Sequence, residues 1–445
     1  MKIERVIKAT TTREGATGES RFVQAAIDRV FEDGGGTVVV PSGMRITTGT
    51  ITLRSRVELH LERGAVVEAS LDPDDYPNST MPALIEAYDA EDVSITGPGT
   101  VEGRAMEFMV KDLGYIYEPA AFRPRLLCFY DCRRVRLEDV TFHDSPFWTV
   151  HLVGCNNVDI ERITIDNNLA IPNCDGIDPD HCRDVTIRDC QITCADDAIV
   201  LKNGGSTIDR GPTENVYVSG CTLMCTAGAI KIGTGTASDF RNLFFSNCTI
   251  RSSSRGLSIQ HRDQGDIENV QFSGFQIETR LFEHHYWGHA EPIHISAVSR
   301  TFRQADGRTM PYNPESKLGR IRGVKFSDIE ARSEGGIVFY GSPDSMIEDV
   351  SLRGIDLRLE KWSKWPGGYL DIRPVDSRGS DVFVDPESDP GRIPGPITAL
   401  QAHCVDGLIV DSLTLRVGTP APEYYTGPVQ LSNAHNVSMN GFLAR

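Results

Sequence analysis

The sequence predicts an all-β chain folded as a right-handed parallel β-helix, and three observations lead to this fold class. A pattern of two short alternating strands, apolar-x-apolar-x-x-apolar-x-apolar, recurs at a spacing mostly in the twenties. Repeats of this length built from such short strands are typical of a solenoid. The period-2 alternation and the shortage of long amphipathic segments argue against helical repeats. Each coil should therefore add one strand to each of several parallel sheets, at about 4.8 Å per coil.

The repeat is located by its first apolar residue, which is found at Val135, Val158, Val185, Val216, Leu243, Val270, Val324, Val350, Leu408 and Val437. Successive separations are 23, 27, 31, 27, 27, 54, 26, 58 and 29 residues, so two gaps are about twice the others. If the coils stack in register, the residue five places later should point inward. Those residues are all apolar: Val140, Ile163, Cys190, Cys221, Cys248, Phe275, Ile329, Ile355, Leu413 and Phe442. A ladder of stacked core side chains explains the three cysteines without a metal.

The open amino end of a solenoid needs a cover, and a helix is predicted there at about residues 19–33. Residues 20–32 (SRFVQAAIDRVFE) have apolar side chains at helical spacing, Ser20 as a candidate N-cap, and glycines 34–36 as a stop. Residues 36–41 and 51–61 should supply early strands. The rhythm is interrupted at about 105–127, 279–320 and 360–403, where we expect loops that shape a cleft on one side. The whole chain, 1–445, is predicted to be one β-helix domain.

Composition narrows the classes of partner. With 62 acidic against 45 basic residues the formal charge is −17, which opposes binding to nucleic acid or to anionic membranes. Eleven cysteines, an odd count without CxxC spacing, read as reduced core residues. Residues 1–8 lack the apolar core of a secretory signal, and no run reaches the roughly 20 apolar residues of a membrane span. A cytoplasmic protein is expected, or a secreted one if a signal has been removed; the oligomeric state is not indicated.

Three carboxylates mark a candidate active site. Asp175 lies in the segment NCDGID, and Asp196 and Asp197 lie 21 and 22 residues later in ADDA, about one repeat further on. Adjacent acids at the end of an apolar strand are costly for folding, because like charges in a partly dry groove disfavour one another. Chemistry is one reason to tolerate them. A calcium site or a set of solvated turn residues is the alternative.

At this point the chain resembles the polygalacturonase-like enzymes of glycoside hydrolase family 28, which share a pectin-lyase-like right-handed β-helix. The resemblance covers at least the first 260 residues. It is carried by FVQAAIDRVFEDGGGTVVVPSG, LHLERGA at 59–65, GPGTVEG at 97–103, DSPFW at 144–148 and NCDGIDPDHCRDVTIRDCQITCADDAIVLKNG. The family's N-x-D and D-D motifs match at Asn173-Cys174-Asp175 and at Asp196-Asp197.

The resemblance implies a glycosidase that degrades a polysaccharide or an oligosaccharide without a cofactor or a metal. Asp196 would be the general acid, and Asp175 and Asp197 would position and deprotonate water in an inverting displacement. Inversion is typical of carboxyl groups roughly 6.5–9.5 Å apart. A cluster of three acids can supply both a protonated and an ionised group, because repulsion separates the steps in which the protons leave.

Two family motifs are absent, which bears on the substrate. Gly228 stands where a Gly-His-Gly histidine is expected, and Ser258 and Gln260 stand where an Arg-x-Lys pair is expected. That basic pair is taken to hold the galacturonate carboxylate. Its loss removes charge-assisted hydrogen bonds of about 1.5–3 kcal/mol each. We therefore expect an enzyme that is not an ordinary polygalacturonase, acting on a pectin-related or neutral glycan.

Two other functions remain open on the same fold. A polysaccharide lyase or epimerase would need a uronic acid, a divalent cation and a base such as Lys202. A non-catalytic carbohydrate-binding β-helix would bind sugar without turnover.

The substrate-binding candidates are Asn173, Lys202, Lys231, His261, Tyr286 and Trp287. The two lysines follow the acids on strands and could contact substrate hydroxyls or a carboxylate. Aromatic rings in the segment FEHHYWGHAEPI could stack on a sugar, with loop packing as the alternative; its three histidines form only a weak zinc pattern. Asp178, Asp180 and His181 are expected to be structural neighbours of the acids.

Overall fold

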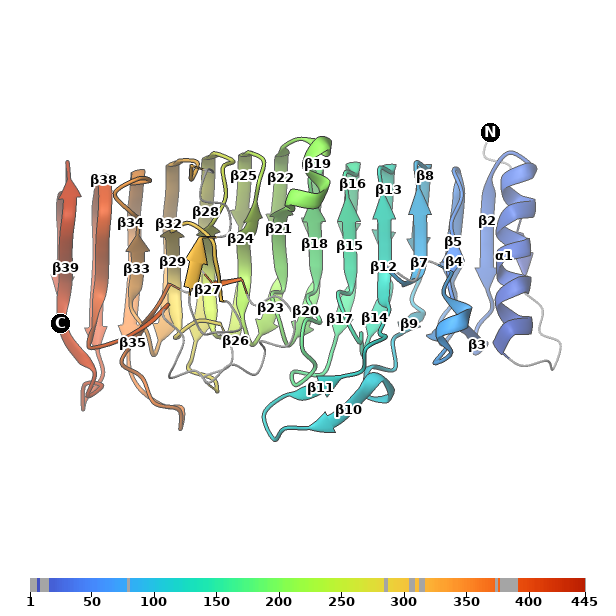
Figure 1. Cartoon of the computed structure of the whole chain (residues 1–445), viewed down its shortest axis with the longest axis horizontal. Coiled ribbons are helices and arrows are strands. Elements are labelled where there is room, and N and C mark those ends of the chain that lie inside the picture. The colour runs from blue at the N-terminus through green and yellow to red at the C-terminus, as the bar shows by residue number, and fades with distance from the viewer. Residues whose placement is uncertain are drawn as a thin grey trace. The chain divides into compact units, whose positions relative to one another are not determined.

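The computed structural model describes residues 6–8, 16–77, 81–283, 287–303, 309–311, 317–372, 375–376 and 391–444. Strands dominate these residues, and successive coils pair in parallel, as a right-handed parallel β-helix requires. The chain divides into two compact units, Met1–Asp196 with Val216–Cys221 and Asp197–Asn215 with Thr222–Arg445. Figure 1 identifies the elements by label and colour. Among the described residues, no helix combines the length and the apolar character needed to cross a bilayer.

The described residues of the first unit include one α-helix, two 3-10 helices and the strands β1 to β20. In chain order they are β1 (Val6–Lys8), α1 (Ala16–Glu32), β2 (Gly36–Val40), β3 (Arg45–Thr48), β4 (Ile51–Thr52), β5 (Val57–Leu61), β6 (Val66–Ala69), η1 (Pro73–Asp75), β7 (Ala83–Tyr88), β8 (Glu91–Thr96), β9 (Thr100–Glu102), η2 (Ala105–Phe108), β10 (Met109–Asp112), β11 (Tyr117–Pro119), β12 (Arg125–Tyr130), β13 (Arg133–Glu138), β14 (Thr141–His143), β15 (Val150–Val153), β16 (Asn156–Glu161), β17 (Thr164–Asp166), β18 (Ile177–Asp180), β19 (Arg183–Arg188) and β20 (Gln191–Cys194).

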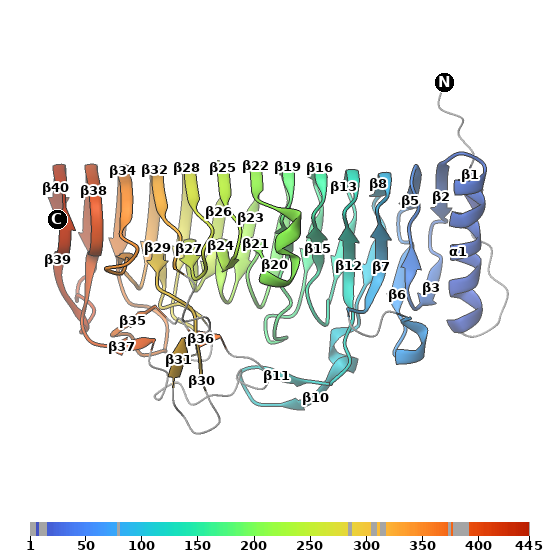
Figure 2. The same ribbon diagram turned by 45° about the horizontal axis from the view of Figure 1, so that its top comes forward.

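Parallel pairing arranges these strands in three rows. One row is β1–β2–β5–β8–β13–β16–β19, the second is β4–β7–β12–β15–β18, and the third is β3–β6–β9–β14–β17–β20. Strands β10 and β11 form a separate antiparallel pair that Figure 2 shows beside the rows. Within the first unit, the last strand of the second row is β18, which directly follows the segment that carries Asp175.

Helix α1 covers the first coil, as the sequence predicts. Its apolar face buries Val23, Ile27 and Val30 against the first strands. The side-chain amide of Gln24 donates to the carbonyl of Thr52 (3.0 Å) and accepts from the Thr52 amide (2.8 Å). It therefore provides hydrogen-bond partners for both backbone groups of Thr52 at the edge of β4. The helix begins at Ala16, four residues before the predicted N-cap Ser20.

The second unit contains η3 and the remaining strands, except that β22 (Thr213–Ser219) has residues in both units. Its other elements are β21 (Ile199–Asn203), η3 (Gly205–Arg210), β23 (Thr222–Cys225), β24 (Gly228–Thr236), β25 (Phe240–Ser246), β26 (Thr249–Ser253), β27 (Arg255–His261), β28 (Ile267–Thr279), β29 (Glu291–Ala297), β30 (Thr301–Arg303), β31 (Thr309–Pro311), β32 (Ile321–Ser333), β33 (Ile337–Tyr340), β34 (Ile347–Leu359), β35 (Tyr369–Asp371), β36 (Val375–Asp376), β37 (Arg392–Pro394), β38 (Ile397–Val417), β39 (Tyr425–His435) and β40 (Ser438–Ala444).

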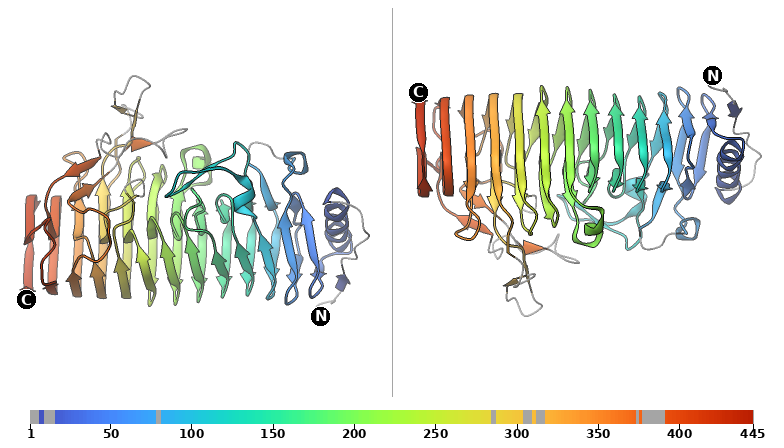
Figure 3. Two further views of the ribbon diagram at one scale, coloured as in Figure 1. Left: turned by 90° about the horizontal axis from the view of Figure 1, so that it is seen from below. Right: turned by 90° about the horizontal axis from the view of Figure 1, so that it is seen from above.

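Two main rows form in this unit. One is β21–β24–β27–β29–β33–β38–β39, and the other runs from β25 through β28, β32, β34 and β38 to β40. Strands β23 and β26 pair with each other, and β26 continues onto β28. Two small sheets, β31–β30–β36 and β35–β37, stand apart from these rows (Figure 3).

The predicted register is confirmed by the pairing. Val135 pairs with Val158, and Val158 with Val185, in the first unit. In the second, Leu243, Val270, Val324, Val350 and Leu408 pair in that order, so the two doubled gaps are insertions between adjacent coils. Nine of the ten residues predicted to point inward are at most 2% exposed. The tenth, Phe442 on β40, is half-buried.

The extra residue within the repeat has a structural role. In all ten repeats the residue four places after the first apolar position has positive φ: Asp139, Arg162, Asp189, Gly220, Asn247, Gly274, Asp328, Gly354, Ser412 and Gly441. The residue just before each repeat also has positive φ, as at Asn215, Asn242 and Asn269, whose amides bond one another (3.1 and 2.8 Å). Glycine, asparagine and aspartate adopt this conformation most readily.

The predicted loop boundaries were too wide in three places. Strand β12 begins at Arg125, β29 lies within the predicted loop 279–320, and β38 begins within 360–403. The outward residues of β29, His294 and Ser296, are polar yet fully buried, because other parts of the second unit cover them. A pattern of buried apolar and exposed polar residues therefore does not identify β29 as a strand. All eleven cysteines are buried thiols, as predicted.

Candidate active site

Asp175 lies on a tight turn that precedes β18 in the first unit. Asn173 has a φ of 57°, and its side-chain oxygen accepts from Arg123 Nη2 (2.7 Å). The carbonyl of Asp175 accepts from the amide of Thr149 on the previous coil (3.0 Å), which continues the parallel ladder of β15 and β18. The Asp175 side chain is 3% exposed.

The second acidic segment follows β20 and is tied to the first by a thiol. Cys174 Sγ accepts from the amide of Ala195 (3.2 Å), and the Cys194 thiol donates to the carbonyl of Asp196 (3.3 Å). Burial raises the pKa of Cys174, which keeps it a neutral thiol. Asp196 is half-buried, whereas Asp197 is 2% exposed.

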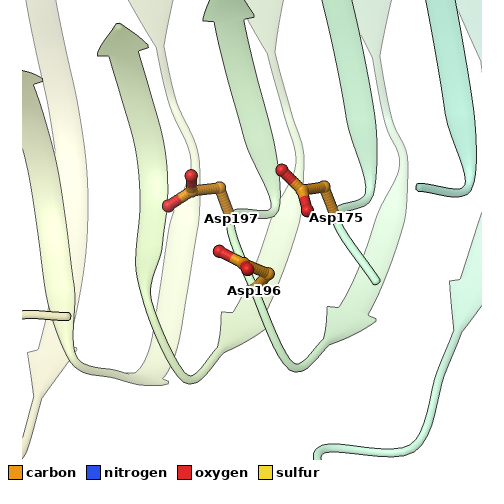
Figure 4. A group of neighbouring side chains, drawn as sticks. All are labelled: Asp175, Asp196 and Asp197. Atoms are coloured by element: carbon orange, nitrogen blue, oxygen red, sulfur yellow. The ribbon is translucent and has the colours of Figure 1, made fainter. Parts of the chain in front are cut away.

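The three carboxylates converge, as the sequence predicts. One oxygen from each of Asp175, Asp196 and Asp197 lies within 4.8 Å of the others. Figure 4 shows the three side chains lying side by side. This distance between the nearest oxygens is shorter than the 6.5–9.5 Å that separates the acid and the base in typical inverting enzymes. Within the described part of the chain it is also the one group of acidic, histidine or cysteine side chains close enough to hold a metal ion.

Asp197 has a fixed set of partners in the second unit. Its Oδ2 accepts from Lys231 Nζ (2.6 Å), and its Oδ1 accepts from the amide of Gly228 (2.9 Å). Lys231, predicted to bind substrate, is 8% exposed and forms a buried ion pair instead. A Cβ atom on Gly228 would lie 3.0 Å from Asp197 Oδ1 and 3.2 Å from Ser258 Oγ, so a larger residue would crowd the carboxylate.

The two positions that lack the expected basic pair are enclosed. Ser258 and Gln260 on β27 are each 1% exposed. Arg255, on the same strand, pairs through Nε with Glu291 (3.2 Å) and through Nη2 with Asp371 (3.3 Å). Burial raises the pKa of Glu291. Arg255, Glu291 and Asp371 thus form an internal ionic network at the start of β27 and β29.

The remaining binding candidates are not brought together. Lys202 is half-buried on β21, and Trp287 is half-buried after β28. His261 is wholly buried at the end of β27, and burial lowers its pKa to about 4. Tyr286 lies outside the described residues.

Asp178 and Asp180 are buried on β18, as expected of structural neighbours. Asp180 lies 3.7 Å from His151 Nε2 and 3.6 Å from His181 Nε2. Asp178 is in register with His151 on the previous coil. These acids sit among imidazoles within the first unit.

Two arginines beside the Asp175 turn, Arg123 and Arg125, were not among the predicted site residues. Arg123 and Arg125 flank Pro124 in a segment predicted to be a loop, and both guanidinium groups pack on the ring of Phe147 (4.4 and 4.9 Å to its centroid). The feature of the sequence that could have drawn attention to them is the close spacing of two basic residues in an acidic chain. Only the coil register shows that they approach the acids.

The fold and the carboxylate site together define a family of glycosidases. A model of glycosyl hydrolases family 28 matches residues 34–283, more than half of the chain, and the chain belongs to this family.

Individual relatives agree with this assignment. A "Probable polygalacturonase" from Vitis vinifera is 30% identical over 243 residues, 49% of this chain and 48% of the relative, so the chain spans about half the length of that relative. Two solved structures share the fold. The hyperthermoactive exopolygalacturonase of Thermotoga maritima is similar with a TM-score of 0.67 at 23% identity, over 84% of this chain and 90% of that one. A polygalacturonase from Erwinia carotovora ssp. carotovora gives 0.62 at 19% identity, over 79% and 92%.

Proposed function

We propose that the chain hydrolyses a glycosidic bond of a pectin-related glycan, with Asp196 as the general acid and with Asp175 and Asp197 acting on the water. The observation that carries the proposal is the convergence of the three carboxylates within 4.8 Å in a member of family 28. Glycoside hydrolysis needs one protonated carboxyl to protonate the leaving oxygen and one carboxylate to activate water. Repulsion among three close carboxylates favours keeping one proton on the cluster.

Differences in environment support the assignment of roles. Asp197 accepts a charge-assisted hydrogen bond from Lys231 and a second bond from the Gly228 amide, so both of its carboxylate oxygens are held in place. Such a group suits the activation of water. Asp196 is the most exposed of the three, so its carboxyl is the one most accessible to a leaving oxygen.

The substrate is proposed to differ from that of an ordinary polygalacturonase. Gly228, Ser258 and Gln260 bring no cation to the positions where the family carries a histidine and a basic pair, and all three are buried. The guanidinium of Arg255 lies on the same strand but is engaged by two internal carboxylates. A substrate carboxylate would have to be recognised elsewhere.

The inverting course is proposed from the family resemblance, because the spacing of the nearest oxygens does not itself support it. Proton NMR of the first product formed distinguishes the two outcomes. Inversion gives the anomer opposite to that of the substrate bond, whereas retention would assign Asp175 or Asp197 as a nucleophile.

The decisive experiment is Asp196→Asn, assayed for release of reducing sugar from a panel of uronide and neutral oligosaccharides. The amide cannot donate an acidic proton, so we expect activity to fall 10²–10⁴-fold, as is typical for loss of a general acid. Asp159→Asn is the matched control, since that carboxylate is 42% exposed and pairs with Arg188. Circular dichroism checks that both variants keep the strand content.

Two results would overturn the proposal. One is an Asp196→Asn variant that retains more than a tenth of the wild-type rate. The other is an unsaturated product that absorbs in the ultraviolet, which would assign the chain to the lyases.

A further inference from the structure

Arg125, Trp148 and Asp175 occupy equivalent places on three successive coils of the first unit. Leu127 pairs with Val150, and Val150 with Ile177. Each of the three named residues lies two positions before one of these partners. The amide of Leu126 bonds the carbonyl of Trp148 (3.3 Å), and the amide of Thr149 bonds that of Asp175 (3.0 Å), which extends the ladder to this level. At about 4.8 Å per coil, Arg125 starts about 10 Å from Asp175.

The guanidinium of Arg125 is a buried cation. The residue is 5% exposed, and its guanidinium carbon lies 4.9 Å from the ring centroids of both Phe147 and Trp148. Its Nε is enclosed without a hydrogen bond. Within the described part of the chain, the Arg125 side chain has neither a hydrogen-bond acceptor nor a carboxylate partner.

Arg123 places a second cation next to the first. Its Nη1 donates to the carbonyls of Pro172 (2.6 Å) and Pro146 (3.1 Å), and its Nη2 donates to Asn173. These hydrogen-bond acceptors are all neutral, whereas the carboxylates of Asp175 and Asp196 act on the guanidinium of Arg123 through space. Burial lowers the pKa of Arg123 to about 10, so the group stays charged at neutral pH. The side chain is half-buried.

Several arginines on the outer faces of the first unit pair with carboxylates: Arg134 with Glu91 and Asp92, Arg162 with Glu138 and Asp139, and Arg188 with Glu161. Arg125 differs from them, because it is buried and pairs with no carboxylate of the described chain. A cation held out of water without an anion is costly, so a ligand that supplies the anion gains that free energy back.

Guanidinium groups recognise planar carboxylates better than ammonium groups do, because their donors form a fork that matches two oxygens. Packing on Phe147 and Trp148 holds this fork in place, so less side-chain entropy is lost when the anion binds. The half-buried rings also offer apolar surface beside the charge.

We propose that Arg123 and Arg125 form a carboxylate-recognition pair, which binds an acidic sugar of the substrate next to the Asp175 turn. The inference rests on the proposed function and assigns two residues of this chain that would hold the carboxylate of a uronide. It also gives the chain a replacement for the basic pair that is absent at Ser258 and Gln260. The residues that select the acidic sugar would then lie on a different coil from Ser258 and Gln260.

Calorimetric titration of Asp196→Asn tests the pair without turnover. The probes are an oligogalacturonate and its fully methyl-esterified form, which differ in charge. We expect the acid to bind at least tenfold more tightly than the ester. Adding Arg125→Met, or Arg123→Met, should weaken binding of the acid about tenfold and leave the ester unchanged.

The matched control is Arg332→Met, which removes a guanidinium packed on Trp362 (4.2 Å) that has carboxylate partners, Glu278 and Glu360. It should change neither affinity. If Arg125→Met does not fold, Arg125→Lys is the test variant. It keeps the positive charge but lacks the forked pair of guanidinium donors, so it should lose part of the preference for the acid over the ester.

The pair is rejected if acid and ester bind equally, or if the methionine variants weaken both alike. Hydrolysis of neutral oligosaccharides without preference for the acid would leave the proposed function standing and remove this inference. If the wild-type chain binds the acid through these arginines but cleaves none of the glycans, this inference stands and the proposed function is overturned.

Discussion

At the scale of single residues, Asp197 owes its environment to two neighbours, Gly228 and Lys231. Gly228 lets its own amide reach Asp197, since a Cβ there would press on the carboxylate. Lys231 completes that site with its ammonium group. Asp196, one residue earlier, remains half-buried. Two consecutive aspartates can therefore carry opposite roles.

His261 is a residue whose sequence context was misleading. It ends β27 and was predicted to contact substrate, yet it is 0% exposed and neither ring nitrogen makes a hydrogen bond of ordinary geometry within the described chain. Burial lowers its pKa from 6.5 to about 4. The folded protein thus keeps this imidazole neutral under mildly acidic conditions.

Stability should accordingly fall as the pH drops from 6.5 to 4. Over that window the unfolded chain binds a proton that the folded chain excludes, which costs roughly 3 kcal/mol once the pH is below 4. In His261→Leu this contribution disappears, so the free energy of unfolding of the variant should improve relative to wild type as the pH falls. Urea titrations at several pH values measure the difference. His435→Gln, at an exposed site, should show none; a pH-independent difference for His261→Leu would contradict the prediction.

At the scale of elements, the corners of the coils follow directly from the repeat. Each repeat contains one more residue than two alternating strands need, and that residue has positive φ in every case. The corner residue is glycine, asparagine or aspartate in eight of the ten repeats. The sequence predicted where the two strands of each repeat separate, and the structure adds that the backbone adopts a left-handed conformation there.

Corner residues should therefore tolerate exchange among these types and reject branched ones. Gly354 has a φ of 62°, and a Cβ there would lie 3.1 Å from Asp328 Oδ1 on the neighbouring coil. Gly354→Val should lower the free energy of unfolding by about 2 kcal/mol, since a left-handed residue costs roughly 1–2 kcal/mol before branching is counted. Asp328→Gly, at the same corner one coil earlier, should change it by less than about 1 kcal/mol. Denaturant midpoints compare the two, and equal losses would refute the argument.

Elements that depend on distant segments could not be predicted. Strand β29 is covered by residues far along the chain, such as Asp371, whose carbonyl lies 3.1 Å from His294 Nε2. Arg123 and Arg125 belong to the same class. Their nearness to Asp175 arises from coil register, which spacing in the sequence does not specify outside the repeat.

At the scale of the whole molecule, the core is reduced and thiol-rich. All eleven cysteines are buried, and burial raises the pKa of Cys128 to about 11. Buried neutral thiols are poor nucleophiles. No cross-link contributes to stability in this arrangement.

A thiol reagent should therefore react slowly with the native protein and with eleven groups in denaturant. The denaturation midpoint should not change when a reducing agent is added. Fewer than eleven reactive groups in denaturant without reductant would reveal disulfides and contradict the assignment.

The side chain of Gln24 has a consequence for how such a chain can lengthen. Its amide imitates a peptide group toward Thr52, so a side chain takes up the hydrogen-bonding groups that a preceding strand would use at this residue. A further coil that paired with Thr52 would have to displace Gln24. A coil inserted between two existing ones would leave this contact intact, and it would have to bring its own pair of left-handed corners.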